Sequence, residues 1–230
     1  RHFMQVAGVH KIFATYRNAA TATELLALET LPSSCVSCLQ LDLTDEAQIQ
    51  VAVENIQATV GQLHYVVNCV GLLHSDAISP EKSLRHLNAD QLSQYFQVNS
   101  IGPALLAKHL LPLLNHSQFN VLATISAKIG SISDNQIGGW YGYRASKAAL
   151  NMLLKTASIE YSRRSKHTAI VMLHPGTTDT RLSQPFQRGV PSERLFSVDR
   201  TVTQLLAILT KLTIADNGKF FAWDGSELPW

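Results

Sequence analysis

Residues 119–126 read Phe-Asn-Val-Leu-Ala-Thr-Ile-Ser, a short apolar run that ends in a serine. A helical pattern follows over Tyr141–Arg163, and a second apolar run follows at Thr168–Leu173. Two short apolar strands that are separated by a long helix form a parallel βαβ unit, because a parallel connection has to cross back over the sheet. This segment therefore predicts an α/β fold.

The same alternation of apolar runs and helical patterns continues on both sides of this unit. The runs are rich in Val, Ile, Leu and Phe and carry little charge, as is typical of parallel strands covered on both faces. No repeat, low-complexity tract or Gly/Ser linker divides the chain. We therefore predict a Rossmann-like, doubly wound parallel sheet in a single domain over residues 1–230. The further runs are Lys11–Tyr16, Cys35–Leu41, His64–Val70 and Lys219–Trp223, and the further helical stretches are Ala20–Leu28, Asp45–Val60, Ala89–Leu114 and Val198–Thr210.

The composition excludes several classes of protein. Of the 230 residues 46% are hydrophobic and 16% are charged, and the formal net charge is +2. A chain without a basic cluster is not expected to bind nucleic acid or an anionic membrane, and no apolar window is long enough for a spanning helix. Three cysteines do not make a disulfide framework, so we expect a cytoplasmic protein. Cys35 and Cys38 lie in one strand, where alternation points them to opposite faces, so no metal site is expected.

The first residues predict an incomplete start to the sheet. Arg1–Val6 has the pattern of a helix end, and Lys11–Tyr16 has the pattern of the strand after it. A doubly wound sheet needs a strand before that helix, beside the crevice where ligands bind. Gly8 is isolated and cannot replace a Gly-rich phosphate-binding turn. We therefore expect the natural protein to carry a first β-strand and a Gly-rich turn before Arg1.

The clearest chemical signal is the stretch YRASK at residues 143–147. Tyr143 and Lys147 are four residues apart, so they lie one turn apart on the same helix face. An ammonium group near a phenol favours the phenolate and lowers the pKa of the phenol, which makes the tyrosine a usable acid and base. The alternative is a surface tyrosine that stacks over a lysine stem. Tyr141 has Ala145 four residues later, so it lacks such a partner.

Other polar residues fall where parallel strands end. Ser126 ends one apolar run, and Asn68 and Gly71 close another, at the edge where open α/β sheets bind ligands. Asn99 lies inside a helical pattern, where an amide side chain is a poor helix former. Each residue alone is explained as a cap, turn or strand end, but their joint order favours one site. The segment after the next strand offers hydroxyls and backbone amides to a ligand, and it contains Pro175, Gly176, Thr178 and Thr180.

Taken together, these motifs resemble those of the short-chain dehydrogenase/reductase family. The likeness extends from the first residues to about Trp223. The stretch SAKIGSISDN at 126–135, followed by GGWY at 138–141, is similar to the branch that contains C-factor-like proteins and sniffer-type carbonyl reductases. Cys69-Val70 replaces the pair of alanines that is common in the family. The matching motifs are Asn68-Cys69-Val70-Gly71, Asn99, Ser126, Tyr143-x-x-x-Lys147 and Pro175-Gly176.

The resemblance implies a role for each matched residue. Tyr143 would be the general acid that protonates a carbonyl oxygen as hydride arrives, while Lys147 would hold the nicotinamide ribose and lower the pKa of Tyr143. Ser126 would hydrogen-bond the same carbonyl, and Asn99 would anchor a water that links Lys147 to solvent. The implied function is reduction of an aldehyde or ketone, and the alternative is a nucleotide-binding, C-factor-like signalling protein in which turnover is secondary. The remaining residues implied to bind the cofactor are Asn68, Gly71, Pro175, Gly176, Thr178 and Thr180.

The sequence also favours one form of the cofactor. Arg17 follows the run Lys11–Tyr16, where an acidic residue would accept hydrogen bonds from a ribose 2′-hydroxyl. An arginine there suits a 2′-phosphate, so we expect NADP(H) in preference to NAD(H). Asp42 resembles the family's adenine contact, although it is explained nearly as well by a capping role beside Thr44, which is the expected N-cap of the helix Asp45–Val60.

Two further expectations concern the surroundings of the site. The irregular segment Gly176–Ser197, with three interruptions by proline or glycine, is expected to be a substrate lid. The apolar faces of Leu92–Leu114 and Ala148–Ile159 exceed what one sheet face needs. This surplus indicates subunit contact in a homodimer or homotetramer, as in relatives that pair through these helices, and the alternative is plain core packing, which leucine at helical spacing more often reflects.

Overall fold

Strands and helices alternate along the whole chain in the computed structural model, which describes residues 1–230. Every strand and helix predicted from Lys11 onward is present, and most of the bounds agree to within two residues. The strands are β1 (Ile12–Tyr16), β2 (Val36–Gln40), β3 (Tyr65–Asn68), β4 (Asn120–Ile125), β5 (Thr168–His174), β6 (Thr177–Thr178), β7 (Leu195–Phe196) and β8 (Phe220–Ala222). The helices are α1 (Thr23–Glu29), α2 (Glu46–Val60), α3 (Ala89–Phe96), α4 (Gly102–Leu114), α5 (Tyr141–Arg164) and α6 (Val198–Leu209).

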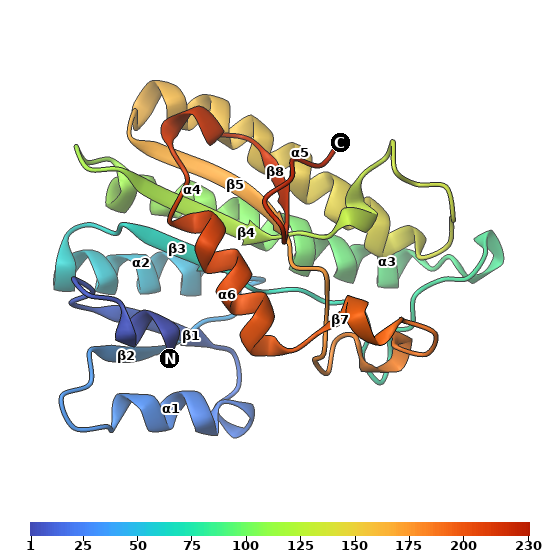
Figure 1. The fold of residues 1–230 in the computed structure, drawn as a ribbon, viewed down its shortest axis with the longest axis horizontal. Helices are drawn as coiled ribbons and strands as arrows, with labels where there is room; N and C mark the ends of the chain where they lie inside the picture. Colours follow the sequence, from blue (N-terminus) through green and yellow to red (C-terminus); the bar gives the residue numbers. More distant parts are fainter.

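The strands form parallel sheets. Four of them pair in the order β3-β4-β5-β8, with Asn68 opposite Thr124 and Ile125 opposite Leu173. β1 and β2 form a separate parallel pair, and no ladder joins β1 to β3 (Figure 1). At the start of the chain, His2–Gln5 forms a short 3₁₀ turn rather than the end of an α-helix. The predicted parallel sheet is therefore confirmed, in two parts that lie side by side.

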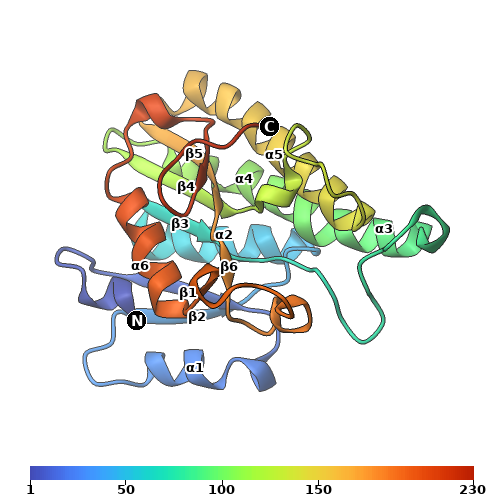
Figure 2. The same cartoon turned by 45° about the vertical axis from the view of Figure 1, so that its right-hand side comes forward.

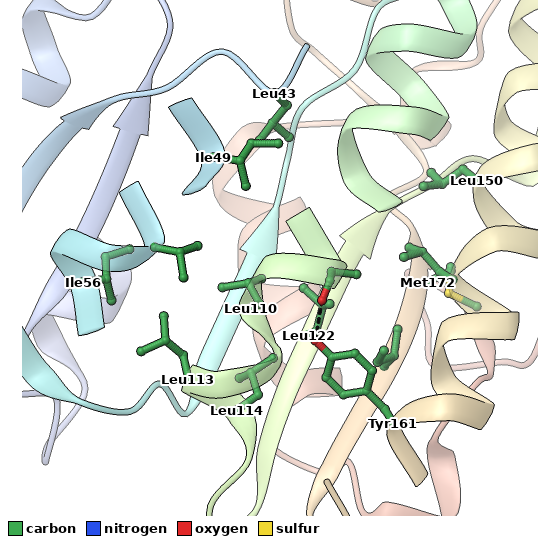
Figure 3. Packing of buried hydrophobic residues seen from close by; sticks show 14 of the residues in the cluster. Leu43, Ile49, Ile56, Leu110, Leu113, Leu114, Leu122, Leu150, Tyr161 and Met172 are labelled. Carbon is green, nitrogen blue, oxygen red and sulfur yellow. Dashed lines mark hydrogen bonds between the residues drawn. The ribbon is translucent and has the colours of Figure 1, made fainter. Parts of the chain in front are cut away.

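Helices cover both faces of the larger sheet, as the uncharged strands predict. In β4, Leu122 packs into a core with α2, α4 and α5, while its neighbour Val121 packs on the opposite face with residues around α6. Figure 1 shows α6 crossing in front of the sheet and α2 and α4 behind it. Figure 3 shows the larger core, where the Tyr161 hydroxyl donates a hydrogen bond to the carbonyl of Ala107 (2.5 Å). This is the Rossmann-like, single-domain arrangement. None of the helices has both the length and the apolarity needed to cross a bilayer.

Three local features differ from the sequence predictions. The helix predicted over residues 89–114 is interrupted by a π-helical turn, η4 (Gln97–Ile101). Asp45, not Thr44, caps α2, because its carboxylate accepts hydrogen bonds from the first free amides of that helix. The segment after β5 is not wholly irregular, since β6 and β7 form a small parallel sheet within it. Figures 1 and 2 show this segment leaving the carboxyl end of β5 toward the side where β1 and β2 lie.

Candidate active site

Tyr143 and Lys147 lie in the first two turns of α5 and are brought together as their spacing predicts. Both side chains are buried, with exposed fractions of 6% and 2%. The Lys147 ammonium lies 5.9 Å from the centre of the Tyr143 ring and donates a hydrogen bond to the carbonyl of Ile125 (3.0 Å). That bond ties α5 to the carboxyl end of β4, directly before Ser126. The pair therefore sits at the edge of the sheet where ligands bind in this class of fold.

The direction of the Tyr143 pKa shift corrects the sequence prediction. Burial raises the pKa of Tyr143 to about 12, whereas the sequence predicted a value below the ordinary one. Burial also lowers the pKa of Lys147 to about 8. Removal of water penalises both charged forms, the phenolate of Tyr143 and the ammonium of Lys147. Burial therefore favours the protonated phenol of Tyr143, which is the form able to donate a proton.

Gly71 lies close to both the Lys147 ammonium and the Asn99 amide. The Asn99 amide is paired in both directions with the backbone of Leu72, at 2.7 and 2.9 Å, and it also donates to the Ser146 hydroxyl (3.0 Å). A Cβ placed on Gly71 would lie 3.6 Å from Lys147 Nζ and 3.7 Å from Asn99 Oδ1. Gly71 follows β3, Asn99 lies in η4 and Lys147 lies in α5, so three separate segments converge on one point. The π-helical turn explains how an asparagine fits here, because such turns free a helical residue for a tertiary contact.

Ser126 also lies in this group, but its hydroxyl already has a partner. Its Oγ donates a hydrogen bond to Oδ1 of Asn151, at 2.7 Å, and both residues are buried. Asn151 lies one turn after Lys147 on α5. We did not identify Asn151 from the sequence, although its spacing of four from Lys147 was a usable signal.

The start of α5 is held by a buried carboxylate that the sequence did not reveal. Trp140 precedes the helix in a left-handed conformation and its side chain makes no capping hydrogen bond. Instead, Glu81 accepts hydrogen bonds from the Gly142 amide (3.1 Å) and from the Gln91 side chain (3.0 Å), and its carbonyl accepts one from Trp140 N (2.5 Å). The Tyr95 ring packs edge-on against Tyr143. Glu81 thus fixes the turn that carries Tyr143.

Further aromatic side chains pack in a chain that ends on Tyr143. Phe186 lies in the segment after β5, and its ring centre is 4.8 Å from that of Trp140 and 5.6 Å from that of His74. Trp140 in turn packs edge-on against Tyr143. His74 also hydrogen-bonds the carbonyl of Arg181 (3.1 Å), which joins the loop after β3 to the start of the same segment. The segment predicted as a lid therefore reaches Tyr143 through Trp140, against which Phe186 packs.

The remaining residues near this edge differ in whether their polar atoms already have hydrogen-bond partners. Asn68 accepts a hydrogen bond from Val70 N (3.0 Å), but its buried Nδ2 has no partner.

The Thr178 hydroxyl pairs with that of Thr201 (2.8 Å), and Thr180 donates to the carbonyl of Thr178 (3.4 Å). Gly176, after Pro175, has a φ of +72°, and a Cβ there would lie 2.5 Å from the Phe196 ring. Gly176 is thus required by packing, whereas Asn68 offers a free donor.

Arg17 and Asp42 lie on the other sheet, at the ends of β1 and β2. The carbonyl of Arg17 accepts a hydrogen bond from Gln40 (3.2 Å), and its side chain is exposed. The Asp42 carboxylate accepts hydrogen bonds from the amide and the hydroxyl of Thr44, at 2.9 and 2.8 Å. Asp42 therefore bonds to Thr44 in the turn before α2 but does not cap the helix, since Asp45 does, and an adenine contact stays a prediction. No three His, Cys, Asp or Glu side chains gather into a possible metal site.

Comparisons with known proteins agree with this geometry. Residues 3–190 match the family model for short chain dehydrogenases. C-signal of Myxococcus xanthus is 32% identical over 139 residues, which cover 60% of this chain and 78% of C-signal. The NADPH-bound carbonyl reductase from chicken fatty liver has a TM-score of 0.87 at 26% identity, over 100% of this chain and 92% of that one. Carbonyl reductase Sniffer of D. melanogaster has a TM-score of 0.86 at 26% identity, over 99% and 92%. The chain therefore belongs to the short-chain dehydrogenase/reductase family and is an oxidoreductase of that type.

Proposed function

We propose that this enzyme uses NADP(H) to reduce the carbonyl group of an aldehyde or ketone to an alcohol. The observation that carries the proposal is the convergence of Tyr143, Lys147, Ser126 and Asn99 at the carboxyl edge of β3 and β4. Similarity to the chicken liver carbonyl reductase, which is described as NADPH-bound, supports both the reaction and the cofactor.

The residues at this edge fit the nicotinamide half of such a cofactor. Asn68 has a buried amide donor without a partner, and Gly71 leaves room beside the Lys147 ammonium. Lys147 would hold the ribose hydroxyls, with Asn68 and Gly71 beside them. Gly176 keeps the backbone after β5 close to this edge, where Thr178 and Thr180 would face the carboxamide and phosphates after breaking their internal hydrogen bonds. When bound, the cofactor supplies the hydride.

The protein's own groups handle the proton and the orientation of the substrate. Tyr143, with a pKa of about 12, holds its proton until negative charge develops on the carbonyl oxygen, and then donates it from Oη. Ser126 Oγ orients the same oxygen. Its hydroxyl is a fixed dipole aimed at the negative charge that forms on this oxygen only in the transition state. Lys147 stabilises the phenolate left behind, and Asn99 would position the water through which that phenolate regains a proton.

Arg17 supports NADP(H) over NAD(H). Its guanidinium is exposed beyond the end of β1, free to form a bidentate pair with a 2′-phosphate. Residues 176–197 would act as a lid, because Phe186 closes on Trp140 above the tyrosine. Exposed apolar side chains on α5, Met152 and Ile159 among them, would be covered by a second copy in a homodimer or homotetramer.

A second candidate function is signalling through nucleotide binding, which the similarity to C-signal favours. The two functions are separated by turnover. Protein made from its complete coding sequence is incubated with NADPH and a panel of aldehydes, ketones and diones, and NADPH oxidation is recorded by absorbance. Carbonyl-dependent oxidation supports the reductase. Tight NADPH binding without oxidation across the panel would contradict it and favour the signalling protein.

A further inference from the structure

Ser126 has one hydroxyl proton, and in this structure it donates that proton in a hydrogen bond to Asn151. The distance from Ser126 Oγ to Asn151 Oδ1 is 2.7 Å, and both side chains are almost fully buried. A serine that donates to Asn151 cannot donate the same proton to a carbonyl substrate. The reductase chemistry therefore requires this hydrogen bond to change.

The other half of the Asn151 amide is unpaired. Its Nδ2 is buried and has no hydrogen-bond partner, which is unfavourable for a buried polar group. The oxygen and nitrogen of an amide exchange places when the side chain turns by half a revolution. After this turn, Nδ2 would donate to Ser126 Oγ, and the hydroxyl proton of Ser126 would be free.

We propose that Asn151 is a positioning residue that sets the direction of the Ser126 hydroxyl. In the free enzyme Ser126 donates to Asn151 Oδ1; when a carbonyl oxygen reaches the site, the amide turns, Nδ2 donates to Ser126 Oγ, and Ser126 donates to the substrate. The serine then accepts one hydrogen bond and donates another, so its alignment toward the substrate oxygen is fixed from behind. This inference rests on the proposed function, because it assumes that Ser126 holds the carbonyl.

The position of Asn151 in the fold suits this role. It lies on α5 one turn beyond Lys147, and that lysine is bonded to Ile125, the residue before Ser126. The helix therefore meets the end of β4 at two successive turns, with an ammonium at the first and an amide at the second. Of these two groups, only the amide can both donate and accept, which is what a serine with two states needs.

The test uses substitutions that change only the hydrogen-bonding character of residue 151. Asn151→Asp has nearly the same shape, but its carboxylate can only accept hydrogen bonds. The Ser126 hydroxyl would therefore remain permanently directed at residue 151. We expect kcat for carbonyl reduction to fall roughly a hundredfold, as when a transition-state donor is lost, with an unchanged dissociation constant for NADPH. Asn151→Ala frees the hydroxyl without aligning it, and we expect a smaller loss, of about fivefold.

Both substitutions are repeated in a Ser126→Ala background, which removes the group on which Asn151 acts. There we expect neither Asn151→Asp nor Asn151→Ala to lower kcat further, because the coupling passes through the serine alone. A role in packing predicts the opposite order, since alanine leaves a cavity and aspartate does not. The alanine variant decides the question even if a buried aspartate prevents folding.

The outcomes separate this inference from the proposed function. Equal losses with and without Ser126, or a greater loss for alanine than for aspartate, would overturn the role of Asn151 while leaving the reductase proposal standing. An unchanged kcat in the single variants would do the same. Full activity of Ser126→Ala alone would remove Ser126 from the reaction, and it would overturn this inference together with that part of the proposed function.

Discussion

The carboxylate of Glu81 accepts a hydrogen bond from the backbone amide of Gly142, with 3.1 Å between Oε2 and N. The first amides of a helix have no partner within the helix, and a buried helix start needs an acceptor from elsewhere. Glu81 is 1% exposed and supplies that acceptor from a loop far away in sequence. The position of Tyr143, one residue after Gly142, therefore depends on a side chain outside its own helix.

Replacing Glu81 should destabilise the protein in a graded way. Glu81→Ala leaves Gly142 N and the Gln91 side chain without their acceptor, and we expect the free energy of unfolding to fall by about 3 kcal/mol. Glu81→Gln keeps one acceptor oxygen and should lose about 1 kcal/mol. Urea denaturation followed by circular dichroism measures both. Equal losses for the two variants would show that the hydrogen bonds are not what Glu81 contributes.

Gly142 is expected to tolerate no side chain, although glycine is otherwise a poor helix residue. A Cβ at this position would lie 2.5 Å from the Tyr95 ring and 2.8 Å from Glu81 Oε1. We expect Gly142→Ala to lower the free energy of unfolding by about 2 kcal/mol through overpacking. Gly71→Ala is the control, because the nearest atom to its Cβ would be 3.6 Å away, and it should change stability by less than about 1 kcal/mol. A Gly142→Ala protein as stable as the parent would contradict the packing seen here.

Stability should fall in weak acid because of His174. Burial, with a smaller contribution from the Lys128 ammonium, lowers the pKa of His174 from its ordinary value of 6.5 to about 4. A depressed pKa means that the folded state favours neutral imidazole, so the stabilisation is fully present above pH 6.5 and is lost as the pH falls toward 4. The expected loss over this window is about 3 kcal/mol.

Removing the imidazole should remove that part of the pH dependence. Denaturation of His174→Phe at a series of pH values is expected to show a flatter profile between pH 6.5 and 4 than the parent protein. His10→Gln, at an exposed position before β1, is the matched control and should keep the parent profile. A parent-like slope in His174→Phe would place the acid sensitivity elsewhere.

Much of the scaffold was readable from the sequence for a physical reason. The strands β4 and β5 are covered on both faces, so Val121 and Leu122 both need to be apolar, and the whole run stands out. The edge residues Ser126 and Asn68 followed from where those runs stop. The spacing of Tyr143 and Lys147 needed only the geometry of one helix.

The remaining features depend on contacts that a local pattern does not contain. The π-helical turn around Asn99 is formed against the backbone of Leu72, from another part of the chain. Glu81 is buried only because α5 begins above it, and a carboxylate in a loop is otherwise read as exposed. The pKa of Tyr143 was predicted in the wrong direction because the extent of burial is set by Tyr95 and Trp140, which the spacing with Lys147 does not reveal.

The choice of cofactor is tested at Arg17. If its guanidinium pairs with the 2′-phosphate, Arg17→Ala should raise the dissociation constant for NADPH by roughly ten- to a hundredfold, as expected for loss of a charge-assisted hydrogen bond. The dissociation constant for NADH should change little, because NADH lacks that phosphate. Fluorescence titration of each nucleotide gives both values. Equal weakening of the two would refute the assignment.

The most direct test of the proposed mechanism compares Tyr143→Phe with Tyr141→Phe. Both remove one hydroxyl from the first turn of α5, but only Tyr143 lies beside the Lys147 ammonium. The kcat for NADPH-dependent reduction of the best carbonyl substrate is measured for both variants and for the parent. We predict a loss of roughly a hundredfold or more for Tyr143→Phe, as for removal of a general acid, and parent activity for Tyr141→Phe. Comparable activity in the two variants would contradict the assignment of Tyr143 as the acid.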